Sequence, residues 1–410
     1  MNQNISKNYF FILFSIIPIS FLIGPAISLI NILLIDVSFI FYILYRRDYR
    51  FINNIAVKVL FVLYIYLIFN SFISQDFFLS IKRNFGFIRF IVLFIAFNFF
   101  FKEYENFNKI FYAWFVIIIF LCFDVYLESL SGTNILGFGE EYGRRIVSFF
   151  KDEPVVGAYL NGFLLIILGS IIHYNKDFTN KYKFIFLLIS VILFGAIVST
   201  GERSNTIKAF IGILTFFILI NNFSLKQKFF SFVTILLLSI FFLSSSEFLK
   251  KRYGGQLIER FSTKEKFIIY YNKNIYFDIY RSGFNVFKNY PIFGVGNKNY
   301  RFESCDEEKN QKFDYHCTTH PHQTYFELLS EHGIIGSLII LGLIFYLLFR
   351  VLRIILLNKN YLQLGCFIYL LIVFIPILPS GSFFNDFNAS LFWINFSIMY
   401  AANKETNIFN

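Results

Sequence analysis

Long apolar runs recur along almost the whole chain. Each run of about 17 to 22 residues is long enough to cross a lipid bilayer as an α-helix. Only 15% of the 410 residues are charged, whereas ordinary globular proteins carry roughly 25%. This pattern excludes a single soluble domain. It predicts an all-α integral membrane protein that crosses the bilayer many times.

We expect about twelve membrane spans. They lie roughly at 9–25, 27–45, 54–73, 84–101, 108–127, 155–173, 184–200, 205–221, 229–247, 334–355, 361–379 and 386–402. Residues 1–247 would hold nine spans and a smaller outer loop near 128–154. Residues 248–333 would form a large, mostly helical outer loop, and residues 334–410 would hold the last three spans. The first span is not predicted to be a cleaved signal peptide, because another span follows at once.

Basic residues predict which side of the membrane each loop faces. Arg46, Arg47 and Arg50 lie in one short loop, and Lys226 and Lys228 lie in another of the same parity. Cytoplasmic loops carry an excess of Lys and Arg, so these loops and both termini are predicted to be cytoplasmic. Anionic membrane lipids at that face account for most of the net charge of +11. No basic block interleaved with aromatic residues points to nucleic acid.

The four cysteines divide into two pairs. Two lie in apolar spans and are predicted to pack there: Cys122 and Cys366. Cys305 and Cys317 share the large outer loop, where a disulfide is permitted. The alternatives are free thiols or a zinc site that would combine these cysteines with nearby histidines: His316, His320 and His322. No standard C-x2-C or H-x3-H spacing supports zinc.

Histidines are concentrated in one polar segment. Four of the five lie within or just before "HPHQTYFELLSEHGIIG", residues 320–336: His316, His320, His322 and His332. The segment is predicted to be helical, because Pro321 is tolerated in a first turn and Gly333 fits a C-terminal stop. His322 would then lie at the start of a helix that leads into the next span.

A second helix is predicted before the histidine segment. Apolar residues recur at helical spacing from Ile275 through Lys288, and the segment ends in a Pro and Gly turn. The polar face would carry Asp278, Arg281 and Asn285. Such a helix is expected to lie on the membrane surface.

The stretch "VSTGERSNTIKAF", residues 198–210, joins two spans through a very short outer turn. Glu202 and Arg203 are therefore expected at the membrane boundary. One interpretation is an interfacial anchor, since Arg side chains reach lipid headgroups. The other is a functional pair, because the turn is too short for free snorkelling and ionisable groups at such depth are often functional.

Four segments resemble the O-antigen ligase and O-antigen polymerase family of bacterial envelope glycosyltransferases. His322 and Gln323, followed by nine residues and Gly333, match the family's H-[NSQ]-x9-G signature. "TGERSN" resembles the outer turn that carries an Arg in the family, although Glu202 replaces the usual small residue. "DIYRSGFNVFKNYPIFGVG" and "GRRIVSFFKDEPVVGAYL" resemble two further family elements. The resemblance covers about residues 140–345.

This resemblance implies a GT-C-like membrane enzyme that needs no metal or other cofactor. It would move a glycan from undecaprenyl pyrophosphate to an acceptor hydroxyl at the periplasmic face of the bacterial inner membrane. A ligase would use lipid A core as the acceptor, and a polymerase would use a second lipid-linked glycan. The sequence does not separate the two, although the histidine signature favours the ligase.

The resemblance also implies residue roles. His322 is predicted to be the general base, because imidazole titrates near pH 6.5, and its alternative is a helix-capping or loop histidine. Arg203 and Arg281 are predicted to stabilise the pyrophosphate, because guanidinium groups bind phosphate oxygens bidentately. Further residues are predicted to bind substrate: Arg144, Arg145, Arg89, His320, Gln323 and Tyr325. His316 and His332 are predicted to be structural.

Two other classes of protein fit parts of the sequence. A lipid-linked oligosaccharide flippase would also be polytopic with buried arginines. It needs no large outer loop or clustered histidines, and the chain shows no internal repeat typical of many transporters. A different lipid-linked sugar transferase would carry an acidic pair in its first outer loop, whereas "IGPA" joins the first two spans here.

Overall fold

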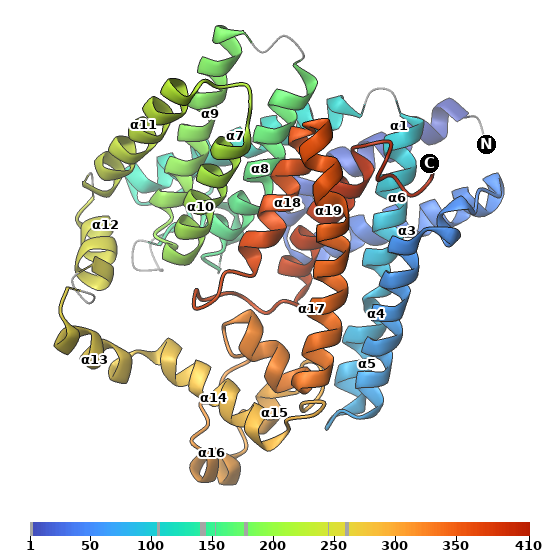
Figure 1. Ribbon diagram of the computed structural model, residues 1–410. Coiled ribbons are helices and arrows are strands. Elements are labelled where there is room, and N and C mark those ends of the chain that lie inside the picture. Colours follow the sequence, from blue (N-terminus) through green and yellow to red (C-terminus); the bar gives the residue numbers. More distant parts are fainter. Residues whose placement is uncertain are drawn as a thin grey trace.

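The computed structural model describes residues 3–104, 107–139, 145–151, 153–175, 179–244, 246–258 and 262–410. Every regular element in these ranges is a helix, as predicted (Figure 1). The helices up to the short outer turn are α1 (Gln3–Ser15), α2 (Ile17–Ile23), α3 (Pro25–Arg46), η1 (Arg50–Asn53), α4 (Ile55–Phe72), α5 (Phe77–Gly86), α6 (Ile88–Glu103), α7 (Asn108–Ser131), η3 (Ser148–Phe150), α8 (Val156–Tyr174) and α9 (Asn180–Ser199).

The second half of the chain holds several short helices and the last apolar ones. They are α10 (Arg203–Leu219), α11 (Leu225–Ser244), α12 (Glu247–Leu249), the π-helix η4 (Lys250–Ile258), α13 (Lys264–Lys273), α14 (Ile275–Asn289), α15 (Tyr300–Ser304), α16 (Glu307–Phe313), α17 (Thr324–Asn358), α18 (Tyr361–Val373) and α19 (Asp386–Ala401). Each predicted span coincides with one of these helices or with a pair of them.

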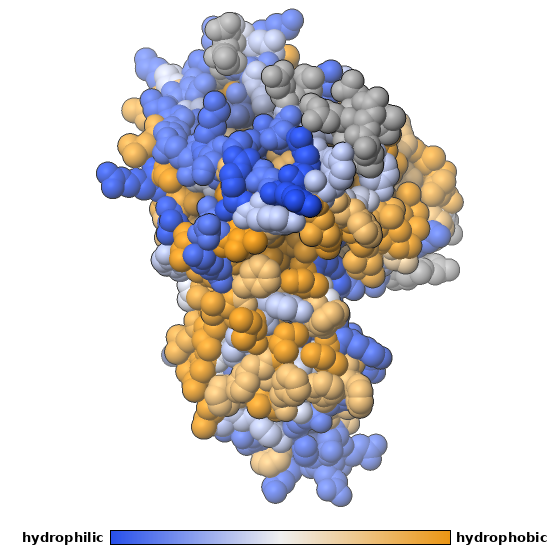
Figure 2. Space-filling model, turned by 90° about the vertical axis from the view of Figure 1, so that its right-hand side faces the viewer, coloured by the Kyte–Doolittle hydropathy of each residue, from blue (hydrophilic) through white to orange (hydrophobic). Residues whose placement is uncertain are grey.

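Eight helical segments among the described residues are long and apolar enough to cross a membrane, and the chain is a multi-pass membrane protein. They are Pro25–Arg46, Ile55–Phe72, Phe77–Glu103, Asn108–Ser131, Val156–Tyr174, Asn180–Ser199, Leu225–Ser244 and Thr324–Asn358. The other four predicted spans lie on shorter helices, so the count of twelve stays a prediction. On the face in Figure 2, apolar residues cover the surface between hydrophilic ends.

Proline and glycine decide where several helices end. Gly24 has a φ of 149°, and Pro25 follows as the first residue of α3, where its missing N–H costs nothing. The span predicted at 361–379 ends early at Val373, and Pro376 and Pro379 lie in the segment that follows. Residues 374–385 therefore form a loop instead of the end of a span.

The centre of the bundle is built from closely packed helices. A Cβ on Gly169 of α8 would lie 2.5 Å from the carbonyl oxygen of Tyr361, and one on Gly365 of α18 would contact the carbonyl oxygen of Leu165. Small residues let helix backbones approach closely, which is how helices associate within a membrane. These contacts hold the first part of α18 against the second half of α8.

The outer helices α13 to α16 lie together at one end of the molecule, and α1 begins at the opposite end (Figure 1). The predicted helix at 275–288 is confirmed as α14, which packs against α17. Arg281 pairs with Asp278 over 3.6 Å on its polar side, and Asn285 donates to the carbonyl oxygen of Phe313.

The histidine segment differs from the prediction at both ends. The helix begins at Thr324, so Pro321 and His322 precede it instead of forming its first turn. Gly333 has a non-helical backbone (φ 62°, ψ −168°), but the chain resumes as a helix instead of stopping. The signature therefore encloses one short helix that continues, through a break, into a long apolar one.

The two glycine-containing motifs form one backbone junction. The N–H groups of Val295 and Gly296 donate to the carbonyl oxygens of Ser330 and Glu331 over 3.0 and 2.9 Å. A Cβ at Gly333 would contact the backbone at residues 292–293. The loop after α14 thus inserts at the break in α17, which requires residues without side chains on both partners.

Candidate active site

One pocket of about 450 Å³ brings together four of the ionisable residues singled out by the sequence: Arg145, Glu202, Arg203 and His322. Its walls come from α8, α10, η4, α13, α14, α18, α19, the start of α17 and the 374–385 loop. The ionisable groups among its described lining, tyrosines aside, are Arg145, Glu202, Arg203, Lys208, Arg252 and His322. The pocket lies where the transmembrane bundle meets the outer helices.

Glu202 closes the short turn between α9 and α10 by binding the start of α8. Its carboxylate accepts from the Gly157 N–H over 2.6 Å and from the Asn205 amide over 2.7 Å. Burial raises the pKa of this carboxyl to about 7, although these hydrogen bonds and Arg145 oppose the shift. Both oxygens are engaged, so Glu202 orients the turn that carries Arg203.

Three arginines gather in the pocket: Arg145, Arg203 and Arg252. The Nε of Arg252 donates to the carbonyl oxygen of Gly201 over 2.5 Å, which fixes its side chain beside the turn. Burial, then the positive charges of Arg145 and Arg203, lower the pKa of Arg252 to about 10. Mutual repulsion of this kind favours binding of an anion between them.

The sequence reasoning did not single out Arg252. It lies in η4, directly after α12, within the basic run "KKR". Basic residues are usually enriched in cytoplasmic loops, whereas this basic run lies in a loop predicted to face outward. That unusual location was the signal in the sequence that could have indicated Arg252.

His322 lines the pocket from the loop that precedes α17. Its backbone is left-handed, with a φ of 53°, and its carbonyl oxygen accepts from the Ser380 N–H over 2.8 Å. Burial lowers the pKa of the imidazole. The neutral ring, which can accept a proton, is therefore favoured near neutral pH.

His320 supports His322 from outside the pocket lining. The two ring centres lie 4.0 Å apart, and Nδ1 of His320 lies 3.0 Å from the Thr319 hydroxyl. Burial, then His322, lowers the pKa of His320 to about 4. A neutral His320 avoids placing a second positive charge against the His322 ring.

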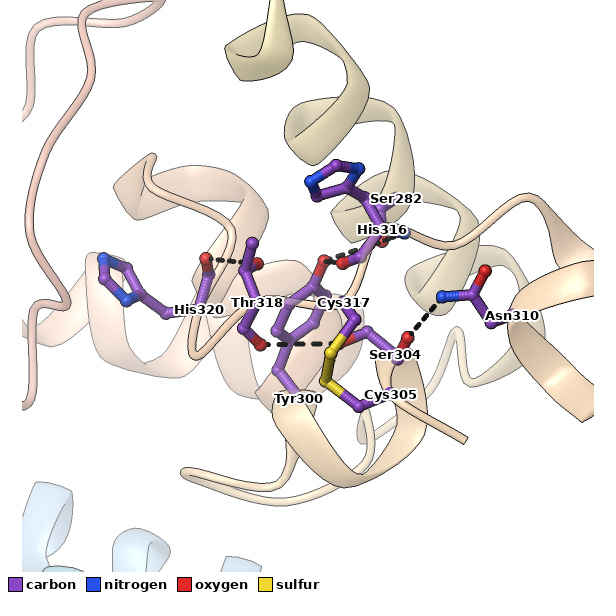
Figure 3. The surroundings of a disulfide bond; sticks show 9 residues. All are labelled: Ser282, Tyr300, Ser304, Cys305, Asn310, His316, Cys317, Thr318 and His320. Atoms are coloured by element: carbon purple, nitrogen blue, oxygen red, sulfur yellow. Dashed lines mark hydrogen bonds between the residues drawn. A yellow bond between two sulfur atoms is a disulfide. The ribbon is translucent and has the colours of Figure 1, made fainter. Parts of the chain in front are cut away.

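The predicted disulfide between Cys305 and Cys317 is confirmed, as Figure 3 shows. Tyr300 and Ser282 share a hydrogen bond of 2.6 Å beside it, and the Ser282 hydroxyl also accepts from the His316 N–H. The Thr318 hydroxyl donates to the carbonyl oxygen of His320. The segment that leads to His322 is thereby anchored to α14 and α15. Cys122 and Cys366 are buried in apolar helices, as predicted.

Several predicted substrate-binding residues lie outside the pocket lining. The side-chain oxygen of Gln323 caps α17 by accepting from the N–H groups of Tyr325 and Phe326. The Tyr325 hydroxyl donates to the carbonyl oxygen of Phe374 over 2.8 Å. Both residues hold the walls of the pocket: Gln323 starts the helix after His322, and Tyr325 fixes the loop that follows α18.

The predicted arginines divide in the same way. Arg145 and Arg203 line the pocket, whereas Arg281 and Arg89 do not. Arg281 lies in the pair with Asp278, and Arg89 forms an ion pair with Asp386 at the start of α19. Arg144 lies outside the described residues.

The two histidines predicted to be structural also lie outside the pocket lining. His332 is fully buried, with Nδ1 3.3 Å from the Tyr66 hydroxyl. The hydrogen bonds described for His316 are made by its backbone.

A buried carboxylate holds one wall of the pocket in place. Glu327 of α17 accepts from the Ser382 hydroxyl over 2.5 Å and from the Phe383 N–H over 2.9 Å. These bonds hold the segment whose Ser380 binds the His322 carbonyl. Glu327 was not predicted from the sequence either, because its partners lie more than fifty residues away along the chain.

Comparison with known families agrees with this geometry. Residues 188–341 match the family model described as O-antigen ligase. This region of the chain is similar to the O-antigen ligase family. The matched domain contains Arg203, Arg252 and His322, and it includes the disulfide and the junction at Gly333. The match supports membership of the ligase and polymerase family that the motifs indicated. No curated protein matches the chain.

Proposed function

We propose that the protein is a glycosyltransferase that moves a glycan from undecaprenyl pyrophosphate to an acceptor hydroxyl. The observation that carries this proposal is the joint location of His322 with Arg145, Arg203 and Arg252 in one pocket of a membrane-spanning O-antigen ligase domain. The pocket joins apolar helices, which suit a lipid-linked donor, to outer helices that suit a glycan.

The arginines would stabilise the leaving group. In transfer, the bond between the anomeric carbon and the phosphate oxygen breaks, and its electron pair stays on the lipid pyrophosphate. The negative charge on that group therefore grows while the sugar gains oxocarbenium character. Preorganised cations in a poorly hydrated pocket stabilise such charge more strongly than water does.

His322 would accept the proton of the acceptor hydroxyl as its oxygen bonds to the anomeric carbon. A general base must be neutral before the reaction and within reach of the attacking group. The lowered pKa of His322 favours the neutral ring, and its place in the pocket lining provides access.

We further propose that the pocket faces the periplasm in the bacterial inner membrane, with both termini in the cytoplasm. The distribution of basic residues among the short loops supports this orientation. The disulfide in the outer helices agrees with an oxidising compartment. No nucleotide sugar is available there, so the lipid pyrophosphate would supply the energy.

The decisive experiment measures glycan transfer by the purified full chain in liposomes that contain a lipid-linked glycan. His322→Ala should lower turnover by about 100- to 10,000-fold, the usual range for a general base, while the donor lipid still binds. His316→Ala is the matched control, because His316 lies outside the pocket lining. Normal turnover in His322→Ala would contradict the assignment. Activity should persist in a chelator, since arginines supply the positive charge in this proposal.

The choice of acceptor distinguishes the two family activities. Transfer to lipid A core identifies a ligase, which we favour because of the histidine signature, and transfer to a second lipid-linked glycan identifies a polymerase. Movement of the lipid-linked glycan across the bilayer without transfer would instead identify a flippase and overturn the proposal.

A further inference from the structure

A buried lysine lies at the inner end of the pocket. Lys208 of α10 lines the pocket with only 7% of its surface exposed. Within the described part of the chain, it takes part in no hydrogen bond or ion pair. Glu202 is the one carboxylate among the described lining residues, and both of its oxygens bind other donors.

Lys208 lies deeper in the bundle than Arg203. It follows Arg203, the first residue of α10, by five positions, so it lies about 7.5 Å further along the helix axis. One turn below it, a Cβ on Gly212 would lie 3.1 Å from Ile372 and 3.3 Å from Leu165. This tight packing lies below Lys208, which is the deepest cation on α10 among the described lining residues.

A second polar group without a complete set of partners lies in the same pocket. Asn161 of α8 has 3% of its surface exposed, and its side-chain oxygen has no hydrogen-bond partner among the described residues. Rotation of the terminal amide can present either its oxygen or its NH2 group to a ligand. The walls here are otherwise apolar and include Ile372, Val373 and Phe392.

An ammonium group is costly to bury unless an anion compensates it. Ionisable residues inside a membrane protein accordingly mark substrate sites. We propose that Lys208, together with Asn161, forms an inner anion subsite that binds the prenyl-linked phosphate of a prenyl diphosphate. This inference rests on the proposed function, which sets the direction in which the donor lies in the pocket. The sugar-linked phosphate contacts the arginines beside His322, the second phosphate contacts Lys208, and the apolar prenyl chain extends from that second phosphate.

The arrangement makes the pocket selective for diphosphates. A diphosphate can bridge the arginines and Lys208, whereas a monophosphate can occupy one of the two positions. Lys208 therefore discriminates between donors by their number of phosphates. Its removal should weaken the binding of a diphosphate more than the binding of a monophosphate.

The test measures binding of farnesyl diphosphate and farnesyl monophosphate to the purified full chain in detergent. Lys208→Met should weaken diphosphate binding by about 10- to 100-fold, the range for a hydrogen bond to a charged group. Monophosphate binding should change less than about threefold, because the arginines remain. Lys208→Arg, which keeps the charge, should retain the preference for diphosphate. Lys58→Met is the matched control, because Lys58 is exposed on α4.

The subsite would be overturned if Lys208→Met weakened the binding of both ligands equally, or weakened the binding of neither. The measurement is independent of catalysis, so the two proposals can fail separately. If the wild type discriminates the ligands through Lys208 but transfers no glycan, the subsite stands and the proposed function falls. If the wild type transfers glycan while Lys208→Met keeps the diphosphate preference, the subsite falls and the function stands.

Discussion

The carboxylate of Glu202 accepts a hydrogen bond from the backbone N–H of Gly157 over 2.6 Å. This contact joins the turn between α9 and α10 to the first turn of α8, where N–H groups have no partner within the helix. Glu202 therefore acts on the pocket by fixing the backbone beside Arg203. An acidic residue at this position is compatible with phosphate binding because its charge is already engaged.

Gly157→Ala should disrupt this contact. The new Cβ would lie 2.9 Å from the Glu202 carboxyl carbon and 3.0 Å from the Thr200 hydroxyl. We expect a loss of stability of about 1–3 kcal/mol, typical of overpacking, together with lower transfer. Gly342→Ala in α17 is the control, because nothing lies within 4 Å of its added Cβ. Thermal unfolding in detergent and the transfer assay measure both effects; equal behaviour of the two variants would contradict the role of Glu202.

Replacement by lysine should lower turnover more at Arg252 than at Arg281. Arg252 lines the pocket, whereas Arg281 pairs with Asp278 outside it. Arg252→Lys should lower turnover by about 100- to 1,000-fold, since lysine keeps the charge but loses the bidentate geometry. Arg281→Lys should lower it by less than about tenfold. The reverse order would restore Arg281 as the residue that binds the pyrophosphate.

The rate of transfer should fall on the acid side of the pH profile. Burial lowers the pKa of His322 below its ordinary value of 6.5, and the imidazole cannot accept a proton once it is protonated. The value of kcat/KM should therefore stay high as the pH falls to 6.5 and decline below it. Glu202, with a pKa of about 7, titrates nearby. Glu202→Gln should keep the decline if His322 causes it; an apparent pKa above 6.5 in that variant would argue against the assignment.

Removal of the disulfide should destabilise the outer helices. Closing the short loop between Cys305 and Cys317 contributes about 3 kcal/mol in the chain-entropy model. The double variant Cys305→Ser, Cys317→Ser should show earlier thermal unfolding and faster proteolysis of the 290–320 region. A reducing agent should reproduce the effect in the wild type and leave the double variant unchanged. If the wild type and the double variant unfolded identically, the packing around Tyr300 would be sufficient to hold the outer helices without the disulfide.

Single cysteines should reveal the orientation. Leu225→Cys, at the start of α11, should resist membrane-impermeant thiol reagents in intact spheroplasts, whereas Glu265→Cys should react. Both positions are exposed on the protein, so a difference between them reports the side of the membrane. The opposite pattern would place the pocket on the cytoplasmic side.

Much of the helical framework follows from the sequence because its causes are local. A run of apolar residues must form a helix in lipid, where each backbone N–H and C=O needs an internal partner. Gly24 and Pro25 end and begin helices through their own backbone geometry, and α14 was predictable from the spacing of its apolar residues. The span predicted at 361–379 is the exception. Its helix ends at Val373, because prolines follow, and the residues after it form a wall of the pocket.

The composition of the site depended on contacts between distant segments. The sequence by itself determined the apolar helices, the paired cysteines and the motif that contains His322. Only the tertiary structure decided that Arg252 joins Arg203 while Arg281 does not, and that Lys208 lines the same pocket. Hydropathy and motif spacing report what a residue does within its own segment. Membership of a pocket is instead set by which helix faces pack together, here through close contacts such as Gly169 on Tyr361 and Gly212 on Ile372.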